Sequence, residues 1–140
     1  MSYWNAFDDA ESSCSVVLED DDRVAYAYFV DRGLSEGKGA PPIIGDVWLY
    51  NVHPAPPEPE LPIGGEPPLN ASPYVRDADS VRLEDASEVV VRWFVMDEQR
   101  YAEVVIDGEV SARLCAGSKP GWSRLAAVDT PVARRLRVSE

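Results

Sequence analysis

The sequence predicts a mainly β (α+β) fold, with one antiparallel sheet of about six strands, a long Pro-rich loop and one C-terminal helix. Three observations lead to this prediction. Apolar and β-branched residues alternate with period two in runs that turn residues separate. Residues 54–73 hold 8 prolines in 20 positions, and proline lacks the backbone donor that helices and sheet ladders need. Only residues 129–138 combine a capping residue with a helix-compatible end.

The first half of the chain contains three runs that we expect to be strands, 14–20, 23–31 and 43–52. Both faces of 23–31 are apolar, so this strand is expected at the centre of the sheet or covered on both sides. Asp20 to Asp22 are expected in the turn before it. We expect the polar residues 1–13 to dock against the rest of the chain, because Trp4 and Phe7 are unusual in a disordered tail.

The second half predicts a three-stranded antiparallel meander of 88–96, 101–106 and 109–116. Residues 97–100 form its first turn, and Asp107–Gly108 is a strong hairpin signal because both central residues need positive φ. In 129–138, Thr130 caps a helix, Pro131 suits its first position, and the arginines after it favour the negative end of the helix dipole.

The Pro-rich loop is assigned to residues 53–75. A run of this length could link two small domains, or could cross the surface of one. We favour the second arrangement and a single domain over residues 1–140, because Leu61, Ile63 and Leu69 give the loop apolar side chains with which to pack.

Charge is the most informative feature of the composition. The net charge is −12, of which residues 1–70 carry −10 and residues 71–140 carry −2. Nucleic acid and anionic membranes are repelled by this charge, because binding to phosphate needs Lys and Arg. A basic protein partner is attracted, although the charge also maintains solubility by itself.

We expect a cytoplasmic protein. No apolar run approaches the length that spans a bilayer, and the first twenty residues lack the basic start and apolar stretch of a secretory signal. Cys14 and Cys115 are too few for a disulfide scaffold, and we expect both thiols to be reduced and to serve as small apolar residues.

Residues for catalysis are sparse. His53 is the only histidine, and no nearby residue in the sequence completes a nucleophilic triad with it. One histidine and two distant cysteines do not make a zinc site, and the aspartate runs lack the spacing of a calcium loop. The glycine-rich residues 33–39 lack the spacing of a phosphate-binding loop. We therefore expect no enzyme activity, no metal and no cofactor.

Two stretches resemble paired landmarks of small bacterial proteins: "IIGDVWLYNVHPAPPEP" (43–59) and "GSKPGWSRLAAVDTPVARRL" (117–136), which together cover 37 of 140 residues. In general type, such chains are similar to immunity proteins of bacterial toxin systems, which are small, acidic and cytoplasmic and have no catalytic residues. The resemblance implies one continuous domain and a protein partner. It transfers no set of binding residues.

The sequence thus leads to the hypothesis of an acidic protein that neutralises a basic partner, most specifically an immunity protein against a cognate toxin. The expected contacts are exposed acids and two aromatic anchors: Asp8, Asp9, Glu19, Asp20, Asp21, Asp22, Glu58, Glu60, Trp4 and Trp122. One alternative is a ligand-binding or enzymatic β domain with a pocket lined by Tyr26, Tyr28, Trp48 and Trp93. Another is a structural oligomer subunit. The sequence leaves the oligomeric state open.

Overall fold

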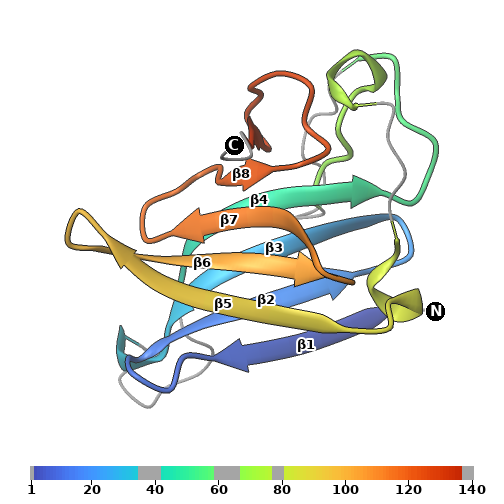
Figure 1. The fold of residues 1–140 in the computed structure, drawn as a ribbon. Coiled ribbons are helices and arrows are strands. Elements are labelled where there is room, and N and C mark those ends of the chain that lie inside the picture. Colours follow the sequence, from blue (N-terminus) through green and yellow to red (C-terminus); the bar gives the residue numbers. More distant parts are fainter. Residues whose placement is uncertain (1, 35–41, 59–66, 77–80, 137–140) are drawn as a thin grey trace.

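The computed structural model of the chain describes residues 2–34, 42–58, 67–76 and 81–136 (Figure 1). The strands form two sheets. The first has the order β1-β2-β3-β4, with β1 Tyr3–Asp8, β2 Cys14–Asp20, β3 Val24–Asp31 and β4 Ile43–Asn51. The second has the order β5-β6-β7-β8-β9, with β5 Val89–Met96, β6 Gln99–Ile106, β7 Glu109–Cys115, β8 Trp122–Ser123 and β9 Arg134–Arg135.

The two sheets face each other, with the second in front of the first in Figure 1. Alternate side chains of both sheets fill the space between them and form one apolar core: Val16, Leu18, Ala27, Phe29, Val47, Ala102, Val104, Ala112 and Leu114. Trp93 of β5 meets Phe29 of β3 edge to face, with ring centroids 5.9 Å apart. The fold is therefore a β-sandwich whose inner faces supply the core.

The predicted mainly β, antiparallel character is confirmed, but the single sheet of six strands is wrong, because the described residues hold nine strands in two sheets. Residues 1–13 contain β1, which was not predicted as a strand. It pairs with β2 from Tyr3 opposite Asp20 to Asp8 opposite Ser15. Strands β8 and β9 are only two residues long, too short for a period-two pattern to reveal them.

The meander predicted for the second half is confirmed as β5, β6 and β7. Its second turn is the expected pair, with φ of 49° at Asp107 and 82° at Gly108. The first turn is shorter than predicted, because Asp97 and Glu98 alone adopt positive φ and β6 begins at Gln99. Two-residue turns of this kind match the right-handed twist of the strands that they join.

The prediction of a C-terminal helix is wrong. Thr130 does cap, since its hydroxyl accepts hydrogen bonds from the amides of Val132 and Ala133, but the chain then turns back. The amides of Arg134 and Leu136 donate to the carbonyls of Gly121 and Ser123, so β9 pairs with β8. Nucleation of a short helix costs free energy. In this chain, pairing of β9 with β8 forms instead of the predicted helix. In the described ranges, no helix has the length and hydropathy needed to cross a membrane.

The chain predicted as the Pro-rich loop is only partly described, and Leu61 and Ile63 lie outside the described residues. Residues 67–71 lie against the first sheet and bury Leu69. Ser72–Tyr74 form a short 3-10 turn, which a uniform loop over 53–75 did not include. The amide of Ser72 donates to the carbonyl of Pro56 over 2.7 Å, so the two described parts of this region are joined by a backbone hydrogen bond.

The free edge of β4 is closed by residues from much later in the sequence. The amide of Asp46 donates to Ser118, the amide of Trp48 donates to Val132, and the carbonyl of Asp46 accepts from Gly121. A Cβ atom at Gly45 would lie 2.6 Å from the carbonyl oxygen of Cys115. Another backbone therefore approaches Gly45 closely, and glycine is required at this position.

A buried polar cluster joins the first sheet to the segment that leads into β5. The carboxylate of Asp20 is fully buried and accepts from the Tyr50 hydroxyl over 2.6 Å and from Arg82 over 3.0 and 3.1 Å. The Tyr50 hydroxyl in turn accepts from the amide of Leu83. Burial, together with the hydrogen bond to Asp20, raises the pKa of Tyr50. Each member of the cluster thus holds another in place.

We expect Asp20→Asn to lower the free energy of unfolding by about 3 kcal/mol, because it leaves Arg82 without its buried partner. Asp21→Asn is the control, since Asp21 is exposed and an asparagine oxygen can still accept the turn hydrogen bonds from Arg23 and Val24. Urea unfolding followed by circular dichroism measures both. Equal losses in the two variants would contradict a structural role that is specific to Asp20.

We expect Gly45→Ala to cost about 2 kcal/mol, because the added methyl group meets backbone rather than a flexible side chain. Gly33→Ala is the matched control, because Gly33 is exposed and its nearest neighbours are side-chain atoms at 3.2 and 3.3 Å. Thermal unfolding reports the difference. A Gly45→Ala variant as stable as Gly33→Ala would show that β4 and β7 can separate freely.

Candidate functional site

The outer face of the first sheet carries an open hollow of about 600 Å³. We call it the acidic groove. Strands β1 to β4 all contribute to it, and prolines 67 and 68 border it: its residues are Trp4, Val17, Glu19, Tyr26, Tyr28, Val30, Ile43, Asp46, Pro67 and Pro68. Its walls are largely apolar, with Glu19 and Asp46 as the two charged groups. None of the described residues that line it is basic.

Aromatic rings form much of the groove surface. Trp4 is 64% exposed and lies directly opposite Glu19 in the pairing of β1 with β2. Tyr26, the next residue across the sheet from Glu19, stacks on Tyr28 with ring centroids 6.0 Å apart and planes 12° apart. Period-two alternation places Trp4, Glu19, Tyr26 and Tyr28 on one face of the first sheet, opposite the face that carries Leu18, Ala27 and Phe29.

Burial and neighbouring charges shift the pKa values of two groups in the groove. Burial raises the pKa of Tyr28, and the charges of Glu19, Asp46 and Asp21 raise it further. Desolvation also raises the pKa of Asp46, against a smaller opposing effect of Lys119. Both shifts have the direction that burial gives to an acidic group, and nearby negative charge adds to it at Tyr28.

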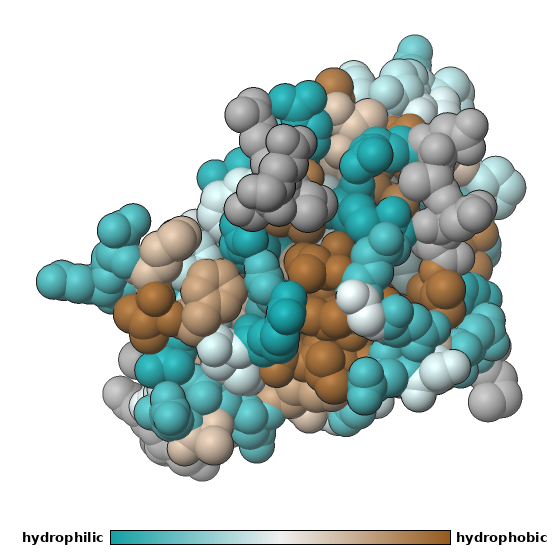
Figure 2. Space-filling model, in the orientation of Figure 1, coloured by the Kyte–Doolittle hydropathy of each residue, from teal (hydrophilic) through white to brown (hydrophobic). Residues whose placement is uncertain are grey.

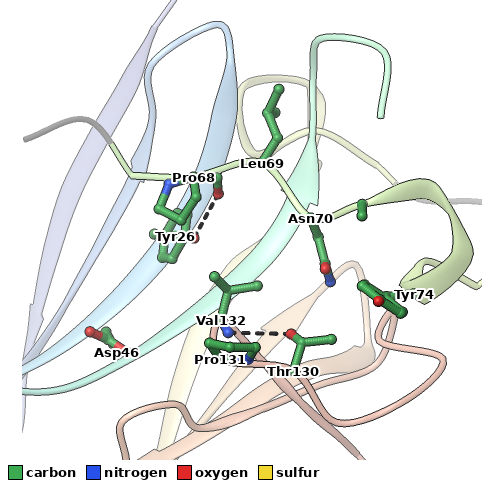
Figure 3. A pocket seen from close by; sticks show the side chains of 10 residues that line it. Tyr26, Asp46, Pro68, Leu69, Asn70, Tyr74, Thr130, Pro131 and Val132 are labelled. Atoms are coloured by element: carbon green, nitrogen blue, oxygen red, sulfur yellow. Dashed lines mark hydrogen bonds between the residues drawn. The ribbon is translucent and has the colours of Figure 1, made fainter. Parts of the chain in front are cut away.

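A second, smaller pocket adjoins the groove, since both share Tyr26, Asp46 and Pro68 (Figure 3). It has a volume of about 270 Å³ and lies between residues 68–71 and residues 130–132. The Tyr26 hydroxyl donates to the carbonyl of Pro68 over 2.7 Å, which holds the proline segment against β3. Asn51 fixes the same segment, since it accepts from the amide of Asn70 and donates to its carbonyl.

This arrangement is suited to holding a cation. Aromatic faces attract Lys and Arg side chains, and carboxylates at the rim supply charge-assisted hydrogen bonds. Anions are repelled by the same groups. The described walls contain no nucleophile paired with a base.

Of the sequence-predicted contact residues, the structure brings Trp4 and Glu19 together in the groove. Asp21 and Asp22 lie in the turn that joins β2 to β3, and the charge of Asp21 acts on Tyr28 in the groove. Asp21 is exposed, and Asp22 accepts from Arg82 over 2.9 Å.

Two predicted contacts are wrong, because Asp9 and Asp20 are buried at 6% and 0% exposure. Asp20 belongs to the cluster with Tyr50 and Arg82, and it ends β2 rather than lying in the turn. Asp9 accepts from Arg100 over 2.8 Å and from the Ser12 hydroxyl over 2.7 Å. Burial acts to raise the pKa of Asp9, but these hydrogen bonds outweigh it and the pKa is lowered.

The other predicted contacts lie apart from the groove. Asp8 is exposed at the far end of β1, and Glu58 is exposed in the proline region. Glu60 lies outside the described residues. Trp122 belongs to the second sheet, where the Arg134 guanidinium lies 4.1 Å from its ring centroid. The ten predicted residues do not form one surface.

The alternative pocket of four aromatic residues is not formed. Tyr26 and Tyr28 face the groove, but Trp48 is fully buried and Trp93 lies between the sheets against Phe29. Sequence reasoning missed Asp46 as a site residue. The signal was present, because a carboxylate interrupts the otherwise apolar run 43–50.

Other candidate chemistry is limited in the part of the chain that the structure describes. His53 is exposed, and its amide donates to the carbonyl of Arg23 over 3.0 Å. The described residues include no group of three or more His, Cys, Asp or Glu side chains placed to hold a metal ion. Cys14 and Cys115 are both free, and burial raises the pKa of the Cys115 thiol.

Comparison with known proteins adds no relative to this description, since no family model, no curated protein and no solved structure matches the chain.

Proposed function

We propose that the chain is a binding protein that neutralises a basic protein partner, and that the acidic groove receives a cationic side chain of that partner. One observation carries the proposal: aromatic rings and two carboxylates share a single open hollow with no basic residue on its described walls. A partner's Arg or Lys would bring a positive charge into contact with Asp46 and Glu19.

The charge distribution supports the same proposal at longer range. Residues 1–70, which include all four strands of the first sheet, carry −10 of the net charge of −12. Such a field accelerates encounter with a basic partner and orients it toward this half of the molecule. Aromatic contacts in the groove then slow dissociation.

The finer part of the proposal concerns the partner's identity. We propose a toxin made by the same bacterial cell, with this chain as its immunity protein and without catalytic activity of its own. The resemblance in type to small acidic immunity proteins supports this identity. The negative net charge supports it as well, because it favours a basic partner. A nuclease toxin fits well, because it needs a basic surface to hold its own anionic substrate.

We expect Glu19→Gln with Asp46→Asn to weaken capture of the partner from a cell extract by about tenfold or more, with faster dissociation as the main cause. The control is Asp97→Asn with Glu98→Gln, which removes the same charge from the exposed β5–β6 turn of the second sheet. Surface plasmon resonance on the captured protein measures both rates at low and high salt.

The outcomes separate the groove from the overall charge. If both double variants lose affinity equally, net charge alone drives binding and the groove has no role. If the wild-type chain captures no basic protein, the neutralising function itself is refuted.

We expect Asp46→Asn alone to weaken partner binding while leaving thermal stability unchanged or higher. Its raised pKa means that the folded state holds the proton more tightly than the unfolded chain, so the charged form opposes folding at neutral pH. Lowering the pH through the raised pKa should therefore stabilise the wild-type fold at this site and weaken binding together. Calorimetric unfolding and binding titrations across pH 4–7 test this pairing of effects, and a destabilised Asp46→Asn would contradict it.

A further inference from the structure

Strand β5 is the outer edge of the second sheet. It pairs with β6 alone, in an unbroken register from Val89 opposite Ile106 to Met96 opposite Gln99. No other strand of the described ranges pairs with it. In an antiparallel sheet every second residue directs its amide and carbonyl away from its neighbour, so about four residues of this strand present unpaired backbone groups at the edge.

The other edges of the two sheets are protected in ways that β5 is not. Backbone hydrogen bonds from Ser118, Gly121 and Val132 close the edge of β4. Strand β9 is only two residues long and consists of arginines. Strand β1 is shorter than β5 and includes Asn5 and Asp8. Short edges and charged edges resist pairing with another chain.

The residues of β5 favour pairing. Its sequence, VVVRWFVM, is β-branched and aromatic, with no proline, glycine or lysine and no bulge in its register. Val90, Val95 and Met96 are 37%, 57% and 46% exposed. Figure 2, which looks onto this sheet, shows apolar side chains gathered over it among polar ones. A long, regular, apolar edge of this kind is a pairing site.

We propose that a second copy of this chain occupies the edge, with β5 paired antiparallel to β5 about a two-fold axis. The charge distribution favours a second copy here over any other contact between copies. Residues 71–140 carry only −2, against −10 for residues 1–70, so contact through this half meets less repulsion than contact through the first sheet. Asp8 and Asp9 lie near Val91 and Trp93, and their charges are paired with Arg32 and Arg100. The two second sheets then form one continuous sheet, and the acidic grooves remain open on the first sheets.

The side chains also select a register. Residues opposite each other must share a face, and Arg92 opposite Arg92 would place like charges together. Shifting by one position places Trp93 opposite Trp93, Arg92 opposite Phe94 and Val90 opposite Met96. In this register Val95 also meets Val91, so all three exposed apolar side chains of β5 gain a partner.

On the outer face of the second sheet, a cluster of aromatic rings and charged side chains lies where this register would place the second copy's Arg92. Phe94 stacks on Tyr101 with centroids 5.4 Å apart, and the Arg113 guanidinium lies 5.8 Å from the Phe94 ring centroid. The second copy's Arg92 would add another cation beside this same ring. Glu103, which already binds Arg92 and Arg113, balances the charge of the cluster.

The first test is the mass of the chain in solution. Sedimentation equilibrium over a range of concentrations should show a monomer–dimer equilibrium for the wild type, and Val95→Lys should weaken dimerisation at least tenfold. Val128→Lys is the matched control, because Val128 is similarly exposed, at 44%, and lies outside β5. Circular dichroism confirms that both variants fold.

The second test is cross-linking between two preparations, one carrying Val90→Cys and the other Met96→Cys. Mild oxidation should give a covalent dimer in the mixture and not in either preparation alone, because the proposed register places position 90 opposite position 96. The native Cys14 and Cys115 are the same in every sample.

Three results would overturn the proposal. One is a wild-type chain that stays monomeric at every concentration. Another is a dimer that Val95→Lys leaves intact or that cross-links equally well in a single preparation, which would assign the contact to other residues. The last is a monomer that captures a foreign protein only while β5 is unmodified, which would assign the edge to a strand of that protein.

Discussion

The buried carboxylate of Asp20 is the constraint on which the two-sheet arrangement depends. A charge without solvent must be fully partnered, and its partners come from both halves of the chain: Tyr50 in β4, and Arg82 in the segment before β5. The hydrogen bonds of the Asp20 carboxylate therefore fix the position at which the second sheet begins relative to the first sheet. It also sets the end of β2, from which Glu19 points outward into the acidic groove.

Local patterns predicted the elements that depend on local physics. The β5–β7 meander results from period-two alternation and from Asp107–Gly108, which adopts positive φ wherever such a turn forms. The division into two sheets results from long-range pairing, which no local pattern encodes. Residues 129–138 illustrate the difference, because Thr130 caps as predicted, but backbone hydrogen bonds to Gly121 and Ser123 then draw the chain into a strand instead of a helix.

The site was predictable in composition and not in position. Alternation identifies Tyr26 and Tyr28 as neighbours on one face, and Trp4 is exposed. The exposed acidic residues were harder to predict, because a sequence does not show whether the side chain of an aspartate faces solvent or binds an arginine. Asp9 and Arg100 are 91 positions apart, and only the folded chain shows that they bind each other. Asp46 was missed because a strand was expected to contribute its apolar residues.

The closure of β4 has a consequence for the order in which the molecule is completed during synthesis. Strands β1 to β4 leave the ribosome first, but the edge of β4 stays open until residues 117–136 have also emerged. Thr130, Pro131 and Val132 also form one wall of the pocket beside the groove. In a nascent chain, the acidic and aromatic side chains of the groove are therefore present before residues 130–132 have formed the wall of the adjoining pocket. The face of the first sheet that carries Trp48 is still uncovered at that stage. The pocket beside the groove is therefore complete only when the second half of the protein has folded onto the first.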